Sequence, residues 1–188
     1  MMSVFSQMKT DEYRRNLADR NIGITELGCI MEFLGNSYGD KVFIYYSGSK
    51  LLIFSNDGGF TDADKEAIRM KNRTGNANLG ASLNGIGVKL AVDRMLKKTK
   101  DENGVEGGKY PAVIYSVTPE ENKTLRMACF QTSEWQDMTD DEYDEYHELV
   151  EENLGNSQEI YGSLWIIPLN FKFRDYINEN WNHIKQNI

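Results

Sequence analysis

The sequence KVFIYYSGSKLLIFSNDGGF, residues 41–60, contains the pattern that sets the expected fold. Two apolar runs rich in β-branched and aromatic residues occupy 41–47 and 50–56, and a Gly-Ser pair at 48–49 separates them. Such a pattern predicts two antiparallel strands joined by a tight turn. A polar, helix-like segment begins at 61, so the hairpin is expected to lead into a helix.

Helix and strand patterns alternate on both sides of this hairpin. Helices are expected at 3–20, 24–37, 61–72, 86–100 and 174–188. Further strands are expected at 110–119, 123–132 and 161–171, with a loop at 73–85 and a turn at 101–109. The acidic stretch 137–153 is either a helix or a mobile segment with solvated charges. The pattern predicts an α+β fold, a two-layer sandwich in which helices cover one face of a mixed, mainly antiparallel sheet.

The composition excludes several classes of protein. The chain has 188 residues, 40% of them hydrophobic, which suits a single domain with one core. Its net charge of −8 argues against a sequence-wide basic surface that binds nucleic-acid phosphates and leaves a local basic patch open. No apolar run predicts a membrane span, and the N-terminus does not read as a secretory signal. With only two cysteines and two histidines, the chain is expected to be intracellular and not to rely on histidine chemistry.

Glu32 and Asn36 form the first candidate site. They stand four residues apart in the segment 24–37, so both side chains project from one side of the expected helix. A carboxylate can orient or deprotonate a water, and an amide oxygen can bind a hard cation such as Mg²⁺. A solvated glutamate followed by an asparagine at the helix C-terminus would show the same pattern. The stripe expected to face the core is Ile24, Leu27, Ile30, Met31 and Leu34.

Two glycine-rich segments form the second and third candidate sites. Residues 57–59, Asp-Gly-Gly, follow an apolar strand, where a carboxylate can accept a hydrogen bond from an exocyclic amine lying against the backbone. An ordinary Asp/Gly turn would also fit. The segment GASLNGIGVKL, 80–90, runs from glycines into a helix, an arrangement whose free N–H groups favour a phosphate. It lacks the Gly-Lys-Ser/Thr of a Walker A motif and follows no strand, unlike a dinucleotide fingerprint.

In this order and spacing the three motifs resemble the GHKL ATPase superfamily, which includes DNA gyrase B and other type II topoisomerases, MutL, ninety-kilodalton heat-shock chaperones, MORC proteins and histidine kinases. Residues 32–36 match its Glu-x-x-x-Asn helix, and 57–59 match most of its Asp-x-Gly-x-Gly strand end. Residues 84–90 are nearest to the topoisomerase form, Asn-Gly-x-Gly-Ala-Lys-Leu. The segment 162–168 resembles the closing Gly-Thr-x-Val strand of the family, with serine for threonine.

The resemblance covers most of the chain and implies a single Bergerat-type ATP-binding domain over 1–188, with an N-terminal helix at 1–20 and a C-terminal helix at 174–188. It also implies a role for each matching residue near the adenine and the attacking water. Glu32 would be the general base that aligns the water, and Asn36 would bind Mg²⁺. Around the adenine, Asp57 would accept a hydrogen bond from the amino group, and Gly59 would let the base lie close to the backbone. Ser163 would support Asp57 through a water.

The phosphates, by the same resemblance, would lie against the backbone of Asn84, Gly85 and Gly87. Lys89 matches the family lysine by position, although its side chain can point away along the helix. Residues 67–84 would form the lid over ATP. The reaction implied is in-line attack of water on the γ-phosphate, catalysed by positioning and charge stabilisation.

Several positions depart from the family pattern. Thr61 replaces the second glycine of Asp-x-Gly-x-Gly, and Gly39 stands where an aspartate often follows the metal-binding asparagine. The lid is short. In topoisomerases, MutL and MORC proteins a following domain supplies a lysine to the γ-phosphate, and none fits after Ser163 in this chain. The chain is therefore expected to be either a fragment of a longer protein or a stand-alone domain with slow or assisted hydrolysis.

The function implied by the resemblance is Mg²⁺-dependent ATP binding and hydrolysis, as the nucleotide-driven clamp module of a topoisomerase- or MORC-like machine. The implied partners are ATP, a second copy in an ATP-dependent homodimer, and DNA only through additional domains; no membrane partner is expected. Two alternatives stay open. One is a small serine or histidine protein kinase of the same superfamily, and the other is an ATP-switched binding module without turnover.

Overall fold

The computed structural model describes residues 25–35, 41–56, 58–60, 87–100, 103–117, 122–127, 139–154 and 161–186. The helices expected at 3–20 and 61–72, the N-terminal helix of 1–20 as a whole and the lid at 67–84 lie outside these ranges. The expected hairpin of 41–60 is present: β1 (Val42–Tyr46) and β2 (Lys50–Ser55) pair antiparallel, and Gly48 takes a φ of 79° in the turn between them.

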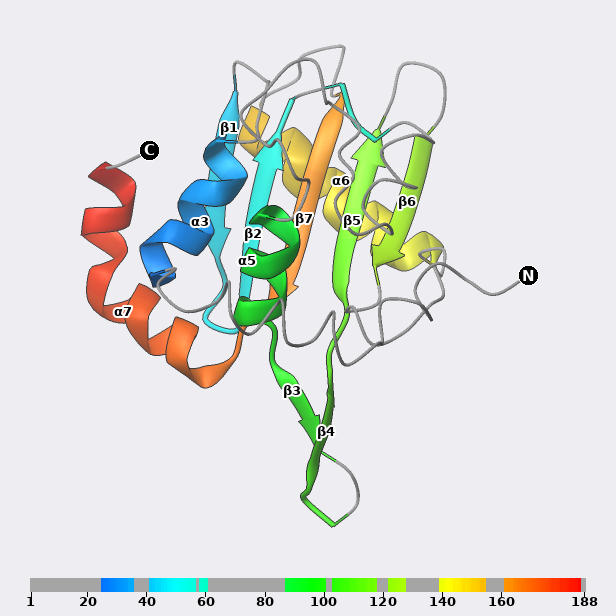
Figure 1. Ribbon diagram of the computed structural model, residues 1–188. Helices are drawn as coiled ribbons and strands as arrows, with labels where there is room; N and C mark the ends of the chain where they lie inside the picture. The colour runs from blue at the N-terminus through cyan, green and yellow to red at the C-terminus, as the bar shows by residue number, and fades with distance from the viewer. Residues whose placement is uncertain are drawn as a thin grey trace.

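Five strands form the main sheet, in the order β1-β2-β7-β5-β6 (Figure 1). The other three strands are β5 (Ala112–Val117), β6 (Asn122–Met127) and β7 (Gly162–Pro168). β7 is the last strand in sequence and lies at the centre of the sheet. Every strand pair in the described part of the chain is antiparallel, so the α+β class with a mainly antiparallel sheet is confirmed, without the parallel pair that a mixed sheet implies.

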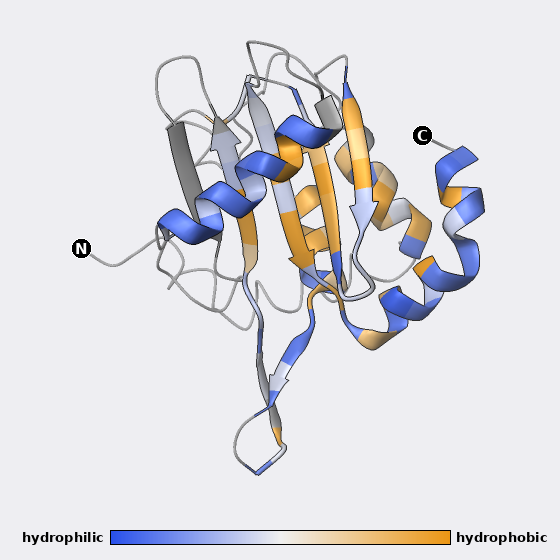
Figure 2. Cartoon of the chain, turned by 180° about the vertical axis from the view of Figure 1, so that it is seen from behind, coloured by the Kyte–Doolittle hydropathy of each residue, from blue (hydrophilic) through white to orange (hydrophobic). Residues whose placement is uncertain are grey.

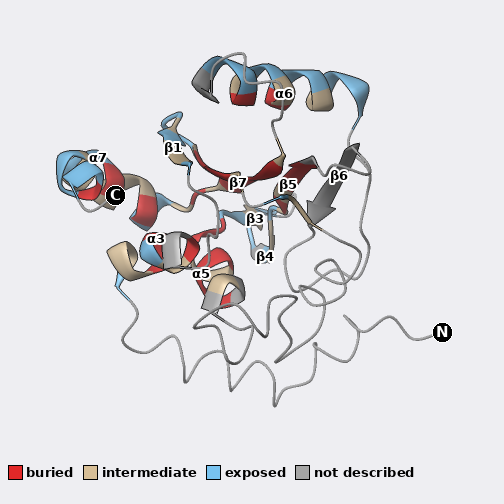
Figure 3. Ribbon diagram, turned by 90° about the horizontal axis from the view of Figure 1, so that it is seen from above, coloured by how far each residue is buried: buried red, intermediate tan, exposed pale blue. Residues whose placement is uncertain are grey.

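Among the described residues, three helices pack on one face of the sheet: α3 (Glu26–Gly35), α5 (Gly87–Met95) and α7 (Phe171–Gln186) (Figure 3). The core on this face contains the odd-numbered residues of β2, Leu51 and Ile53, packed with buried side chains of all three helices. Within the described ranges, no helix combines the length and the apolar character needed to cross a bilayer.

The opposite face of the sheet is covered by α6 (Asp140–Leu154), so the expected two-layer arrangement is wrong in this respect (Figure 3). The physical reason lies in β2, where the even-numbered Leu52 and Phe54 are as apolar as their neighbours and need a partner of their own. Tyr146 and Val150 of α6 pack against them. Viewed from behind, α6 shows a mostly hydrophilic surface across strands that are hydrophobic at their centres (Figure 2).

A polar and aromatic network joins α6 to β5 on this second face. The Tyr115 hydroxyl is hydrogen-bonded to His147 Nδ1 at 2.5 Å, and His147 Nε2 lies 3.2 Å from Glu151 Oε1. The ring of Tyr143 stacks on His147 with centroids 5.6 Å apart. Burial raises the pKa of the fully buried Tyr115 above its ordinary value, so its hydroxyl stays protonated and can donate. The acidic stretch is thus a docked helix with a solvated outer face.

Helix boundaries differ from expectation where capping residues or strand contacts intervene. α3 begins after Thr25, whose Oγ1 accepts a hydrogen bond from the Gly28 N–H at 3.0 Å. Met31 is 37% exposed, while Cys29 and Phe33 are buried instead, which corrects part of the predicted core stripe. α7 begins three residues earlier than expected because the Asn170 side chain caps it by accepting from the Phe173 N–H.

The helix expected over 86–100 stops at Met95, because Leu96 forms a β-bridge with Leu169. Residues beyond the bridge form β3 (Lys98–Lys100), which pairs with β4 (Glu106–Lys109) inside the segment expected to be a turn. This small hairpin projects away from the main sheet (Figure 1).

An ion-pair network ties the three helices of the first face together. The Glu26 carboxylate of α3 pairs with Lys172 Nζ of α7 and lies 3.8 Å from an Arg94 guanidinium nitrogen of α5. The Glu26 side chain is only 17% exposed. Its hydrogen bond with Lys172 lowers the pKa of the carboxyl below the ordinary value, against an opposing effect of burial.

Acidification is expected to weaken this network. Because the folded-state pKa of Glu26 is lowered, its contribution to stability is complete above the unfolded-state pKa and is lost as pH falls through the folded-state value. Glu26→Gln should therefore reduce the free energy of unfolding at pH 6 and make no difference at a pH below both values. Urea unfolding from pH 7 to pH 2.5 measures this, with the exposed Glu148→Gln of α6 as control. An equal loss at every pH would contradict the ion-pair explanation.

Candidate functional site

Three buried serines lie side by side on neighbouring strands, at the end of the sheet where β2 and β5 finish and β7 begins. The register pairs Ser55 with Ser163 and Ser163 with Ser116, and each residue is at most 7% exposed. Two residues further into each strand, on the same face of the sheet, Trp165 pairs with Ile53 and with Ile114. All three lie in the core beneath α3 and α5. At this end of the sheet the buried face therefore changes from apolar side chains to hydroxyl groups, which is unusual for buried strand positions. We call the three residues Ser55, Ser163 and Ser116 the serine floor.

The chain leaves this floor through the glycine segment that follows β2. Asn56 closes the β1–β2 ladder: its N–H donates to the Lys41 carbonyl at 3.1 Å, and its side-chain oxygen accepts from the Lys41 N–H at 2.8 Å. Gly58 and Gly59 then have φ values of 87° and 77°, in the left-handed region that favours glycine. Asp57 itself lies outside the described residues.

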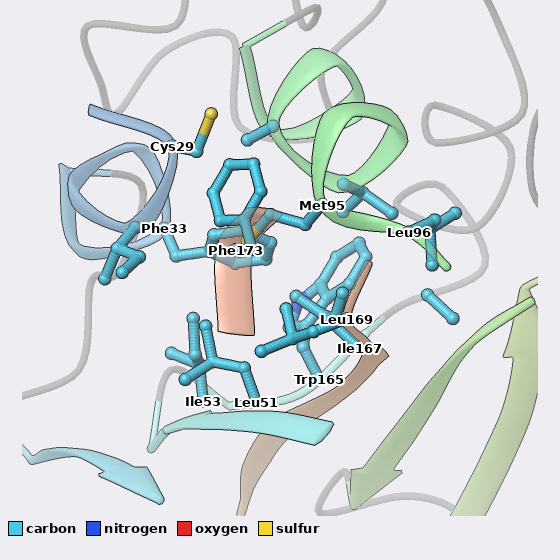
Figure 4. Packing of buried hydrophobic residues seen from close by; sticks show 14 of the residues in the cluster. Cys29, Phe33, Leu51, Ile53, Met95, Leu96, Trp165, Ile167, Leu169 and Phe173 are labelled. Carbon is cyan, nitrogen blue, oxygen red and sulfur yellow. The ribbon is translucent and has the colours of Figure 1, made fainter. Parts of the chain in front are cut away.

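Trp165 of β7 links this segment to α3. The Phe33 ring of α3 meets Trp165 edge-on with centroids 5.3 Å apart, and the Phe60 ring meets it at 5.9 Å. Figure 4 shows Phe33 and Trp165 in the same packed cluster beneath the helices. Glu32 precedes Phe33 and Gly59 precedes Phe60, while Ser163 lies two residues before Trp165 on the same strand face. These three predicted site residues therefore belong to segments that converge on one side chain.

Glu32 lies at the border of the buried face of α3. The residue is half-buried, whereas Cys29 and Phe33 of the same helix are buried. Burial raises the pKa of the Cys29 thiol to about 11, so the thiol stays protonated and is not a nucleophile at neutral pH.

The N-terminus of α5 points to the same end of the sheet. α5 begins at Gly87, and its C-terminal end joins the far end of β7, where the Lys97 N–H donates to the Pro168 carbonyl at 2.8 Å. Its first turn therefore lies toward the end at which β7 starts, as Figure 1 shows. The first N–H groups of a helix have no partner within the helix and carry partial positive charge, so an anion is stabilised there.

The other predicted site residues are only partly covered by the structure. Asn36, Asn84 and Gly85 lie outside the described residues, and Lys89 is described as helical backbone without its side chain. Among the residues that are described, no group of three or more His, Cys, Asp or Glu side chains is placed to hold a metal. This leaves the expected Mg²⁺ ligand, Asn36, as a prediction.

Sequence reasoning missed Ser116 as a candidate. The signal was present in the strand pattern, because Ala112, Ile114 and Ser116 share one face of β5 and the first two are buried core residues. Ser116 is the third residue of this set, and its hydroxyl indicates that the apolar core ends there. Ser55 carries the same signal in β2, after Leu51 and Ile53.

Comparisons with known proteins add no family to this description. No family model matches the sequence, and no curated protein matches it significantly.

Proposed function

We propose that this chain is a Mg²⁺-dependent ATP-binding and ATP-hydrolysing domain of the GHKL type, with a Bergerat-type arrangement, serving as the nucleotide-driven clamp module of a topoisomerase- or MORC-like machine. The observation that carries the proposal is the convergence on Trp165 of segments holding Glu32, Gly59 and Ser163. The N-terminus of α5 at the same end of the sheet supports a phosphate position. The antiparallel sheet with α3 and α5 on one face is compatible with such a fold.

Each segment then has one task in the reaction. Adenine would lie against the Gly58-Gly59 backbone with its amino group on Asp57, over the floor formed by Ser55, Ser163 and Ser116. The phosphates would extend toward Gly87, where helix N–H groups hold them. Glu32 would accept a proton from the attacking water and orient it toward the γ-phosphorus.

Mg²⁺ suits the donors that the sequence motifs predict. The candidate ligands are oxygen groups, the amide of Asn36 and the ATP phosphates, and the neighbouring Cys29 thiol stays protonated. When bound, the cation would neutralise charge on the phosphates. The acidic net charge of −8 does not oppose ATP binding, because the local N–H groups and the cation decide the field at the phosphates.

Thermal unfolding with Mg²⁺ and a non-hydrolysable ATP analogue tests the proposal. A ligand at 100 times its Kd stabilises the folded state by about 2.7 kcal/mol, which is a rise in Tm of roughly 5–10 °C for a domain of this size. Asp57→Asn should lose most of this rise, because the amide presents a donor where the adenine amino group needs an acceptor. Asp140→Asn, at the exposed start of α6, is the matched control and should keep it.

Two outcomes would count against these assignments. No rise in Tm for the wild type would overturn the nucleotide site as a whole. A rise that survives Asp57→Asn unchanged would leave nucleotide binding in place and overturn the adenine assignment alone.

A further inference from the structure

We infer that Ser116 is a positioning residue that determines how tightly the proposed site holds adenine; the inference rests on the proposed function and extends it. The Ser116 side chain comes from β5 and is fully buried. Its Oγ accepts a hydrogen bond from the Phe60 N–H at 2.7 Å, although the two residues are 56 positions apart in sequence. This bond holds the segment that follows the two glycines after β2.

The segment that follows β2 crosses the sheet from β2 to β5, and the hydrogen bond between Phe60 and Ser116 lies at the end of this crossing. β7 lies between β2 and β5 in the sheet, so the chain that leaves β2 at Ser55 must cross the row of Ser163 to reach Ser116. Neighbouring strands are about 4.8 Å apart, so the crossing spans about 10 Å. Gly58 and Gly59 make this crossing with positive φ values of 87° and 77°, and a side chain on Gly58 would meet no atom within 4 Å.

Phe60, at the far end of the crossing, is held through both its backbone and its ring. The backbone donates the hydrogen bond to Ser116, and the ring makes the edge-on contact with Trp165. The ring contact fixes the side chain but allows the backbone to rotate about it, whereas the hydrogen bond fixes the backbone itself. The position of the Gly58-Gly59 backbone, against which adenine is proposed to lie, therefore depends on the Ser116 hydroxyl.

Ser116 acts through this backbone and does not touch the nucleotide, since it is wholly covered. Ser116→Ala would leave the Phe60 N–H without its acceptor and let the glycine backbone move. Because the phosphates are proposed to bind at α5, on a separate element, the loss should fall on the adenine contact alone. Affinity for ATP should drop about tenfold, which corresponds to one hydrogen bond, while affinity for inorganic tripolyphosphate should not change.

The test is calorimetric titration of the whole chain with Mg²⁺-ATP analogue and with Mg²⁺-tripolyphosphate. The variants are Ser116→Ala, Ser116→Thr, which keeps the hydroxyl on a residue favoured in strands, and Thr139→Ala. Thr139 caps α6 on the opposite face, where its Oγ1 accepts from the Glu142 N–H at 3.3 Å, so its loss lowers stability away from the site. We expect tenfold weaker ATP binding in Ser116→Ala, affinity within about threefold of wild type in Ser116→Thr, and unchanged affinity in Thr139→Ala.

The outcomes separate this inference from the function on which it rests. Wild-type chain that binds neither ligand overturns the proposed function, and the inference with it. Wild-type chain that binds ATP, with equal affinity in Ser116→Ala, overturns the role of Ser116 and leaves the proposed function standing. Equal weakening of ATP and tripolyphosphate in Ser116→Ala would show a general structural loss and would also overturn the positioning role.

Discussion

Glu32→Gln is expected to retain ATP binding and to lose ATP turnover by at least about 100-fold, the usual effect of removing a general base. Glutamine has nearly the same shape and keeps an acceptor oxygen, so the packing of α3 beside Cys29 and Phe33 should be preserved. It cannot take the proton of the attacking water. The loss should therefore appear in kcat, with the Kd for the non-hydrolysable analogue within a few-fold of wild type.

Release of inorganic phosphate under single-turnover conditions measures this effect, and the analogue titration measures binding. The matched control is Glu148→Gln, an exposed carboxylate on α6 at the opposite face of the sheet, which should hydrolyse ATP at the wild-type rate. Turnover that survives in Glu32→Gln would remove Glu32 from the reaction. Binding without turnover in the wild type would favour the ATP-switched module, and phosphate found on a protein partner would favour the kinase alternative.

Local patterns predicted the two hairpins on either side of the central strand correctly. The β1–β2 hairpin could be predicted because its strand residues and its Gly-Ser turn are neighbours in sequence, and β5–β6 for the same reason. The position of β7 between β2 and β5 could not be predicted in this way. β7 pairs with β2 across more than a hundred residues of sequence, and no local pattern contains such a pairing. The end of α5 at Met95 likewise depends on the distant Leu169.

The second helical layer was missed because the charges of α6 hide its apolar face. Tyr143, Tyr146 and Val150 recur at helical spacing and pack against the sheet, and His147 binds Tyr115 of β5, but acidic residues occupy most positions around them. The apolar character of β2 at four consecutive positions was the other available signal, since a strand buried on both faces reads as a continuous apolar run.

In the candidate site, too, features within one short segment could be predicted and contacts between distant segments could not. The motifs carrying Glu32, Asp57 and Gly87 could be read directly because each is a short run of residues. Trp165 could not be read as their meeting point, since it contacts Phe33 and Phe60 from positions that are far away in sequence. Ser116 was missed because its partner, Phe60, is 56 residues distant.

Gly162→Ala is expected to cause a severe loss of stability. A Cβ at this position would lie 2.2 Å from the Ser55 carbonyl oxygen, 2.7 Å from Phe54 Cζ and 2.9 Å from Asn56 Cα. Two of these atoms are backbone, so the clash is relieved only if β2 and β7 separate at the end that carries Ser55 and Ser163. Overpacking of this kind costs about 3 kcal/mol, equivalent to a fall of roughly 1–3 M in the urea midpoint.

Gly107→Ala on the projecting β3–β4 hairpin is the matched control, because a Cβ there meets no atom within 4 Å. It should change the free energy of unfolding by less than about 0.5 kcal/mol, as an exposed substitution does. An unchanged urea midpoint in Gly162→Ala would contradict the close approach of β7 to β2. If the variant still folds at low temperature, its ATP affinity should fall as well, because separating the strands displaces the serine floor and the start of the Gly58-Gly59 crossing. The single hydrogen atom of Gly162 thus allows both the close strand pairing and the position of the proposed adenine surface, so stability and binding should be lost together.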